Sequence, residues 1–513
     1  MEMVALWKQW GQEFAKTLPL NPMLVFSLLL LSFVYLFRLR RTHKLKLPPS
    51  PPKLPIIGNL HQLGTFHFRS LKKLSDKYGP LMLVHFGNVP TLVVSTAEMA
   101  HEITKNHDAI FADRPKTSAG DVLFFGRQDI AFCPYGEYWR QAKKVCVLQL
   151  LNQKRVQHFE FVRREETTEL VEKLRHACAE GSPVDLSEML TTISSNIVSR
   201  SALGTIYDNE SGRKSNSSGD LVRTGIDLVG SFSFKDSFPC LGWLDVLTGL
   251  NNKVKKASKE LHGFLDQVIE EHIQASKSQD KADDRKDIVD ILLQLERNRM
   301  LTVDFTRERM KAILMDMFIG GTDTTATTME WTMAELMKNP SIMKKAQEEV
   351  RRVVGNKLKV DESDLDQMTY LKCIVKETLR HHSGIIPRQT TTSIKLEGYD
   401  IPSNTKVLIN AWGIQRDPRI WEKPDDYIPE RFIDNPTDFK SQDKKYIPFG
   451  FGRRVCPGIS FALKEVEYVL ANLLLLFDWK LPDGQGPEDL DMSEVFYLVN
   501  RKKESLMIVP TVH

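Results

Sequence analysis

Apolar side chains recur at helical spacing along most of the 513-residue chain, and strand-like alternation is confined to a few short segments. The longest helical stretch runs from about Ala312 to Met337. Residues 81–86 and 91–94 flank the turn-forming residues 87–90 in the manner of a β-hairpin, and residues 407–409 are another short strand candidate. The pattern predicts one mainly α-helical domain with a small β region, a fold class that does not by itself name a function.

The first fifty residues combine an apolar run with a basic cluster. Residues 23–37 are apolar except for two serines, and the run approaches the ~20 residues that a bilayer span needs. Five basic side chains follow it within residues 38–46 and only Lys8 and Lys16 precede it, which places the N-terminus in the lumen and the rest of the chain in the cytosol. A cleaved signal peptide is the alternative, but no small-residue cleavage site follows the run. We therefore expect residues 1–46 to form a single-pass membrane anchor with a basic stop-transfer segment.

Proline dominates the segment after the basic cluster. Residues 47–58 contain Pro48, Pro49, Pro51, Pro52 and Pro55, which fix φ and deny this stretch a regular helix or sheet. A proline-rich ligand for another protein would have the same composition. We expect residues 47–58 to be a stiff hinge and residues 59–513 to be a single catalytic domain.

Composition and charge narrow the class of protein. The chain is 42% apolar and 27% charged, which suits a large folded core, and its net charge of +4 gives no indication of nucleic-acid binding. The six cysteines are scattered, without CxxC pairs or zinc-site spacing, as in proteins of a reducing compartment.

One segment, residues 449–458, surrounds a cysteine with ligand-binding residues. Gly450 and Gly452 let the backbone turn sharply and approach a large planar ligand, and Arg454 can pair with an anionic group. Pro457 is suited to opening a helix directly after Cys456, and the positive end of that helix would stabilise a thiolate. A lone cysteine is more often a small buried hydrophobe, as we expect for the other five, but here the surroundings favour a ligand.

The same segment is similar to the haem-binding signature of cytochromes P450, which Phe449, Gly452, Arg454, Cys456 and Gly458 fill. The resemblance implies the cytochrome P450 fold, a haem b cofactor and Cys456 as the axial thiolate ligand of its iron. It also implies that Arg454 binds a haem propionate and that Phe449 packs beside the sulfur.

A second similarity to this family lies between Glu377 and Arg380. Residues three apart share one helix face and can pair, as they do on many surface helices. The resemblance adds Arg431 and implies a buried network of Glu377, Arg380 and Arg431 beneath the haem. Because burying charges costs desolvation, we expect the network to fix geometry more than it adds stability.

Residues 318–325 interrupt the long apolar helix with two glycines and several polar side chains, which are poor helix formers. A simple kink is the alternative explanation. In a haem enzyme that activates O₂, Gly320 and Gly321 leave room, and Asp323 and Thr324 can pass protons. We predict that Asp323 and Thr324 are the catalytic proton relay.

The resemblance assigns further cofactor contacts. Trp139 and the residue four positions later would grip the propionates, but that residue is Lys143 where the family usually has arginine. Lysine supplies a positive charge but cannot bind a carboxylate through two parallel N–H groups as arginine does. The propionates are therefore bound less firmly, or Arg140 binds them instead. We also place Arg388 among the cofactor-binding residues.

After Arg380 the chain differs from the plant members of the family that it resembles. Its segment between Arg380 and Arg388 is about two residues shorter than theirs. Two adjacent histidines stand there, His381 and His382. Neighbours in sequence rarely bind one metal ion, so we interpret them as a solvated helix end. The expected substrate pocket is apolar, which does not identify the substrate; its predicted lining residues are Phe124, Phe318, Gly320, Ile385, Ile386 and Phe496.

The resemblance covers essentially the whole chain and is closest to the plant microsomal branch. It implies an NADPH- and O₂-dependent monooxygenase that oxidises a small lipophilic specialised metabolite, such as a terpenoid, alkaloid or phenylpropanoid. The chain has no glycine-rich nucleotide motif, so electrons would come from NADPH–cytochrome P450 reductase, with cytochrome b5 as a second donor. The expected docking residues are Lys143, Lys144, Lys444, Lys445 and Arg453.

The expected location is the endoplasmic reticulum membrane, with the catalytic domain in the cytosol. Two other classes stay open. A haem-thiolate isomerase or dehydratase would dispense with the proton relay and with NADPH, and a non-enzymatic haem protein would not need a substrate pocket.

Overall fold

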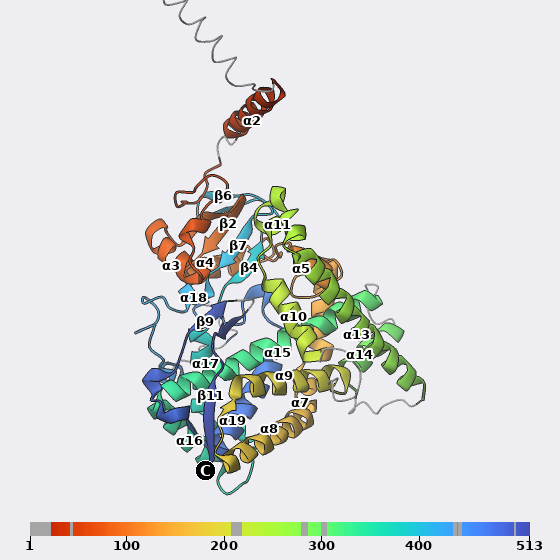
Figure 1. The fold of residues 1–513 in the computed structure, drawn as a ribbon, viewed down its shortest axis with the longest axis vertical. Coiled ribbons are helices and arrows are strands. Elements are labelled where there is room, and N and C mark those ends of the chain that lie inside the picture. Colours follow the sequence, from red (N-terminus) through yellow and green to blue (C-terminus); the bar gives the residue numbers. More distant parts are fainter. Residues whose placement is uncertain are drawn as a thin grey trace, which may run out of the picture. The chain divides into compact units, whose positions relative to one another are not determined.

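The computed structural model describes residues 22–41, 45–206, 218–278, 286–298, 305–433, 439, 444–496 and 499–513. These residues are mainly helical with small sheets, as predicted (Figure 1). They divide into two compact units, residues 1–48 with 394–401, and residues 49–393 with 402–513. The division falls inside the predicted hinge of residues 47–58.

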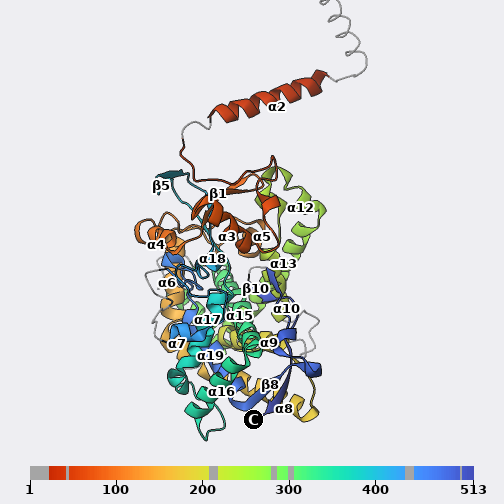
Figure 2. The same ribbon diagram turned by 90° about the vertical axis from the view of Figure 1, so that its left-hand side faces the viewer.

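The larger unit is built around a buried helix, α15 (Arg307–Lys338), which spans the predicted helical stretch 312–337. Figures 1 and 2 show it passing between the other long helices of this unit, and it packs against α9, α17 and α19. The long helices besides α15 are α8 (Glu160–Glu180), α9 (Leu186–Leu203), α10 (Ser218–Gly230), α13 (Leu250–Ser278), α16 (Pro340–Val354), α17 (Thr369–His381) and α19 (Ile459–Leu476). The shorter helices are α3 (His67–Tyr78), α4 (Ala97–Asn106), α5 (Ser118–Leu123), α6 (Glu137–Val145), α7 (Gln153–His158), α11 (Phe234–Ser237), α12 (Leu244–Leu247), α14 (Ile288–Arg297) and α18 (Ala411–Ile414).

Four strands of the larger unit form a sheet in the order β1-β2-β7-β4. The predicted hairpin is present as β1 (Leu81–Phe86) and β2 (Val89–Val94), joined by a turn shorter than predicted, at Gly87 and Asn88. The predicted strand at 407–409 is β7 (Lys406–Ile409), which pairs with β2 in parallel and with β4 (Ile386–Gln389) antiparallel. The sheet thereby holds Ile386 and Arg388 in a fixed register.

The remaining strands make three small sheets. In the larger unit, β11 (Met507–Val512) lies between β3 (Val184–Asp185) and β8 (Phe477–Lys480), and β9 (Glu494–Phe496) pairs with β10 (Asn500–Lys502). In the smaller unit, β5 (Ile394–Leu396) pairs with β6 (Tyr399–Ile401), and the Lys46 amide donates to Asp400 Oδ2 at 2.9 Å.

The smaller unit also contains α2 (Pro22–Arg41), which coincides with the apolar run of the sequence. Among the helices that the structure describes, none is long and apolar enough to cross a membrane. The predicted anchor of residues 1–46, of which 1–21 and 42–44 lie outside the described residues, stays a prediction.

Candidate active site

A tight loop presents Cys456 at the start of α19. Gly450 and Gly452 have φ of 73° and 62°, values that favour glycine, and a Cβ on Gly452 would lie 2.5 Å from Asp108 Oδ1. The Cys456 amide donates to the Phe449 carbonyl at 3.0 Å, and Phe449 itself packs edge-on against Phe439. The predicted pairing of a cysteine loop with the beginning of a helix is present.

The sulfur receives one backbone hydrogen bond. The Gly458 N–H donates to Cys456 Sγ at 3.4 Å, and α19 begins one residue later. Burial nevertheless raises the pKa of the Cys456 thiol, although the Gly458 N–H and the Lys143 ammonium act in the opposite direction. The end of α19 alone therefore does not keep the Cys456 sulfur deprotonated. A bond from the sulfur to a metal ion would do so.

Three guanidinium groups gather around this loop, those of the buried Arg388 and Arg454 and of the partly buried Arg114. Burial and the charges of Arg114 and Arg454 hold the pKa of Arg388 well below its usual range. Arg388 Nη2 donates to the Phe451 carbonyl at 2.7 Å, but its buried Nε has no hydrogen-bond partner among the described residues. Such a cluster suits an anionic ligand, and the propionates of haem have this charge. The cysteine loop and the guanidinium groups together fit a haem.

Arg454 and Trp139 are bonded to the backbone. Arg454 Nε donates to the Ala112 carbonyl at 2.6 Å, and its Nη1 shares the Ile130 carbonyl with Trp139 Nε1, each at 3.0 Å. The Ile130 N–H in turn donates to Asp316 Oδ2 at 2.5 Å. The predicted propionate contacts of Arg454 and Trp139 stay predictions, and the structure shows these two side chains fixing the 130–133 loop.

Lys143 supports the cysteine loop. Its Nζ donates to the carbonyls of Val455 at 2.7 Å and Arg453 at 2.5 Å, and burial lowers the pKa of Lys143 to about 8. Because this ammonium is directed at backbone and Lys444 is buried, the prediction that both lysines dock a redox partner is wrong. Lys144 is exposed, as that prediction requires.

The predicted relay residues lie on α15, where Gly320 and Thr324 are exposed among buried neighbours. Thr324 Oγ1 donates to the Gly320 carbonyl one turn earlier at 2.6 Å. The carboxylate of Asp323 pairs with Arg501 of β10, whose Nη2 lies 2.8 Å from Asp323 Oδ1. Burial raises the pKa of Asp323 and Arg501 opposes this shift.

Arg501 was not predicted to belong to the site. Its Nη1 also lies 3.4 Å from Asp227 Oδ1 on α10, so one guanidinium joins α10, α15 and β10 beside the relay acid. The sequence signal is weak: Arg501 is one of the basic residues in a short strand near the C-terminus. Arg114 was likewise not predicted to belong to the site.

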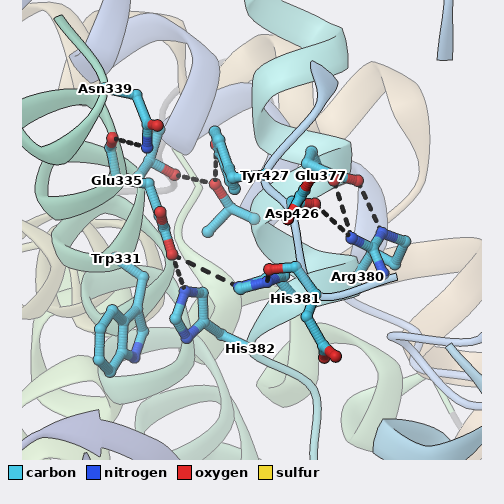
Figure 3. A network of polar contacts seen from close by, with 12 residues as sticks. Trp331, Glu335, Asn339, Glu377, Arg380, His381, His382, Asp426 and Tyr427 are labelled. Carbon is cyan, nitrogen blue, oxygen red and sulfur yellow. Dashed lines mark hydrogen bonds and ion pairs between the residues drawn. The ribbon is translucent and has the colours of Figure 1, made fainter. Parts of the chain in front are cut away.

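The structure brings Glu377, Arg380 and Arg431 together. Arg380 binds both carboxylate oxygens of Glu377, at 2.7 and 2.8 Å (Figure 3). Arg431 Nε lies 3.1 Å from Glu377 Oε1. Glu377 and Arg380 are fully buried. Arg380 also donates to the Gln415 carbonyl at 2.7 Å, so the network anchors the chain that leads to the cysteine loop.

The histidines after Arg380 do not form the solvated helix end that the sequence predicted. Both face the carboxylate of Glu335 on α15 (Figure 3). Glu335 lies 46 positions before His381, so proximity along the chain gave no sign of it.

The predicted pocket residues are not all together. Phe318 lines a small cavity together with Leu261 and Phe264 of α13, on the side of α15 opposite Gly320. Phe124 is buried and stacks on Phe132, and Ile385 packs on the β1–β2 hairpin. Ile386 is near the cysteine loop, because its Cδ1 lies 4.0 Å from the point where a side chain on Gly450 would begin. The side chain of Phe496 lies outside the described part of the chain.

Comparisons with known proteins agree with this geometry. The model of the family "Cytochrome P450" matches residues 48–508. Phenylacetaldehyde oxime monooxygenase of Prunus mume is 48% identical over 99% of this chain and 98% of its own. Cytochrome P450 71A1 of Persea americana is 49% identical over 89% of this chain and 91% of its own, and desmethylyatein synthase of Sinopodophyllum hexandrum is 48% identical over 95% and 98%. The chain therefore belongs to the cytochrome P450 family and is a monooxygenase.

Proposed function

We propose that this monooxygenase uses O₂ and electrons from NADPH to hydroxylate or otherwise oxidise a small lipophilic plant metabolite, of the terpenoid, alkaloid or phenylpropanoid type. The observation that carries the proposal is the cysteine loop at the start of α19, with its Gly458 N–H on the sulfur and the guanidinium groups of Arg114, Arg388 and Arg454 around it. Two relatives, a phenylacetaldehyde oxime monooxygenase and a desmethylyatein synthase, support a specialised metabolite as substrate.

Cys456 would hold haem b as the thiolate ligand of its iron, and Arg388 with its neighbouring guanidinium groups would bind the propionates. When bound, a thiolate-ligated haem supplies O₂ activation. Lys143 fixes the loop by binding the carbonyls of Arg453 and Val455. The Glu377–Arg380–Arg431 network fixes the chain that precedes it.

The remaining chemistry that the chain itself must supply is proton delivery. Asp323 keeps a proton more readily than an exposed aspartate because burial raises its pKa, and Thr324 is the next hydroxyl along α15. Thr324 Oγ1 is bonded to the Gly320 carbonyl, so the hydroxyl must leave that acceptor to donate elsewhere. Asp323 is the proton source and Thr324 the donor in this proposal.

Electrons would come one at a time from NADPH–cytochrome P450 reductase, with cytochrome b5 as a second donor. An acidic docking surface on these partners suits the exposed Lys144 and half-exposed Arg453, close to the cysteine loop. The apolar run of residues 23–37 and the basic residues after it support attachment to the endoplasmic reticulum membrane, with the catalytic domain cytosolic.

Co-expression with a plant reductase in microsomes tests this function. Extracts of small lipophilic metabolites are incubated with and without NADPH, and products are identified by mass spectrometry. We expect a product heavier by one oxygen atom, or a product derived from it, that forms only with NADPH and O₂. A product that forms at the same rate without NADPH would instead assign the chain to the isomerase or dehydratase class.

A further inference from the structure

Three side chains outside the haem site converge on one point between α15 and the end of α17. Glu335 Oε1 lies 2.8 Å from His382 Nε2 and 3.4 Å from His381 Nδ1 (Figure 3). All three atoms lie within 4.8 Å of one another. The exposed fractions of the side chains are 5% for Glu335, 15% for His381 and 9% for His382. This cluster is therefore largely shielded from water.

The hydrogen-bond partners define the protons of His381. Its Nε2 lies 3.0 Å from the Asp425 carbonyl, which can only accept, so Nε2 carries the hydrogen. The buried Nδ1 then points a lone pair at the Glu335 carboxylate, and it has no hydrogen-bond partner among the described residues. A lone pair facing a carboxylate is repulsive unless a positive charge lies between them, either a second proton on the imidazole or a metal cation.

We propose that Glu335, His381 and His382 form a binding site for a divalent transition-metal ion of the Zn²⁺ type. Two imidazoles and one carboxylate are ligands that zinc accepts. A metal-binding imidazole commonly donates its other N–H to a backbone carbonyl, as His381 does to Asp425.

The separations suit this ion. With zinc–ligand bonds of about 2.0–2.2 Å, ligands in a tetrahedron lie roughly 3.3–3.5 Å apart. The Glu335 Oε1–His381 Nδ1 separation of 3.4 Å matches that edge. The Glu335 Oε1–His382 Nε2 separation of 2.8 Å is that of a hydrogen bond, and it would widen by about 0.5 Å when the metal replaces the proton. Zinc binding at Nε2 thus requires the single N–H proton of the neutral His382 imidazole to move to Nδ1.

The surroundings hold the ligands in place. The imidazole of His382 stacks on Trp331 of α15, with ring centroids 3.9 Å apart and planes inclined by 11°. The positive charge of Arg416 acts on His382 and would oppose the binding of a metal ion. Arg416 Nη1 also donates to the His381 carbonyl at 2.5 Å, which holds the backbone of this ligand in place. The ligand positions are therefore largely fixed before a metal arrives.

The metal would act as a structural clamp. It would tie α15, which carries Asp323 and Thr324, to the end of α17, from which the chain continues into β4 with Ile386 and Arg388. This role does not depend on which substrate the enzyme oxidises.

Metal analysis of the full-length, haem-loaded enzyme tests the site. The protein is treated with a chelator, equilibrated with an equimolar amount of ZnCl₂, passed through a desalting column and analysed for zinc and iron. We expect about one zinc per haem iron, with a zinc X-ray absorption spectrum of nitrogen and oxygen ligands that includes imidazole scattering. Competition with a zinc-binding dye gives the affinity.

The variants His381→Leu and Glu335→Gln each remove one ligand with little change of volume. Both should weaken zinc binding more than about 100-fold, the upper end of what losing a hydrogen-bond partner of a metal ligand costs. His176→Leu changes a histidine side chain that is 78% exposed on α8 and should leave zinc binding unchanged.

Three results would overturn the site: a wild-type enzyme that retains no zinc, variants that retain as much as the wild type, or sulfur ligands in the absorption spectrum. In the first case the cluster holds only a proton. If a variant does not fold, the wild-type zinc content and spectrum still decide.

Discussion

The guanidinium of Arg501 lies 2.8 Å from the carboxylate of Asp323, although 178 positions separate the two residues. This ion pair lowers the pKa of Asp323, whereas burial raises it. Arg501→Gln removes the lowering effect, so Asp323 should keep its proton to higher pH. We expect the pH profile of product formed per NADPH to move to higher pH, with a loss of stability of about 1–3 kcal/mol.

Lys503→Gln is the matched control for this variant, because Lys503 is a nearby cation whose side chain is 59% exposed. Its pH profile should coincide with that of the wild type. An unchanged profile in Arg501→Gln would mean that Asp323 does not titrate on the proton path.

Thr324→Ala should separate electron consumption from product formation. Haem binding and the first reduction need no proton from Thr324, whereas losing a positioned proton donor typically slows its step about 10²–10⁴-fold. NADPH consumption should continue while hydrogen peroxide replaces product. Product and peroxide per NADPH are the quantities to measure.

Thr328→Ala is the control one turn along α15, where the hydroxyl donates to the Thr324 carbonyl at 2.8 Å. It should keep its coupling. If Thr324→Ala also stays coupled, Thr325 or a chain of water molecules carries the proton instead.

Cys456→Ser should abolish activity, because a hydroxyl is a poor axial donor. The reduced, CO-bound spectrum of the wild type should show the Soret band of a thiolate-ligated haem, and the variant should lack it. A variant that kept this band would exclude Cys456 as the ligand.

Glu465→Gln should alter the pH dependence of stability. Glu465 is fully buried on α19, accepts a hydrogen bond from Ser194, and burial raises its pKa from 4.5 to about 8. The folded state therefore binds the proton of the Glu465 carboxyl group more tightly than the unfolded state does. The stability of the wild type falls as pH rises through the window from 4.5 to about 8.

Glutamine does not titrate, so Glu465→Gln removes the pH dependence of stability that Glu465 causes. The free energy of unfolding of Glu465→Gln relative to the wild type should grow by about 1.4 kcal/mol per pH unit inside the window. Denaturant unfolding at pH 5.5 and 7.5 measures it, with Glu172→Gln, whose side chain is 62% exposed, as control. A difference that is the same at both pH values would contradict the raised pKa of Glu465.

Deleting residues 1–41 should release much of the enzyme from microsomal membranes and leave the haem spectrum intact, because the compact unit that carries the cysteine loop begins at Pro49. Sedimentation of microsomes, followed by CO-difference spectra of both fractions, measures this. A truncated enzyme without bound haem would show that the folded domain extends into the deleted residues.

Features encoded locally could be predicted from the sequence. Short apolar runs on either side of the turn at Gly87 and Asn88 specify a hairpin whichever way the rest of the chain folds. The cysteine loop is equally local, since its glycines, proline and cysteine lie within ten positions, residues 449–458.

Contacts between distant parts of the chain could not be predicted. The Glu335 carboxylate meets His381 and His382 only because α15 packs against α17, and periodicity shows which face of a helix is buried, not which helix covers it. The same limit explains Lys143: charge suggested a surface role, whereas packing directs its ammonium at the Val455 carbonyl.

The backbone of Ile130 is held on both sides, its N–H by Asp316 and its carbonyl by Trp139 and Arg454. A rearrangement of the 130–133 loop must break these hydrogen bonds together, because α6, α15 and the cysteine loop all hold the same residue. The loop and the cofactor-binding residues therefore open as one cooperative unit, and hydrogen exchange at the Ile130 amide would report the free energy of that opening.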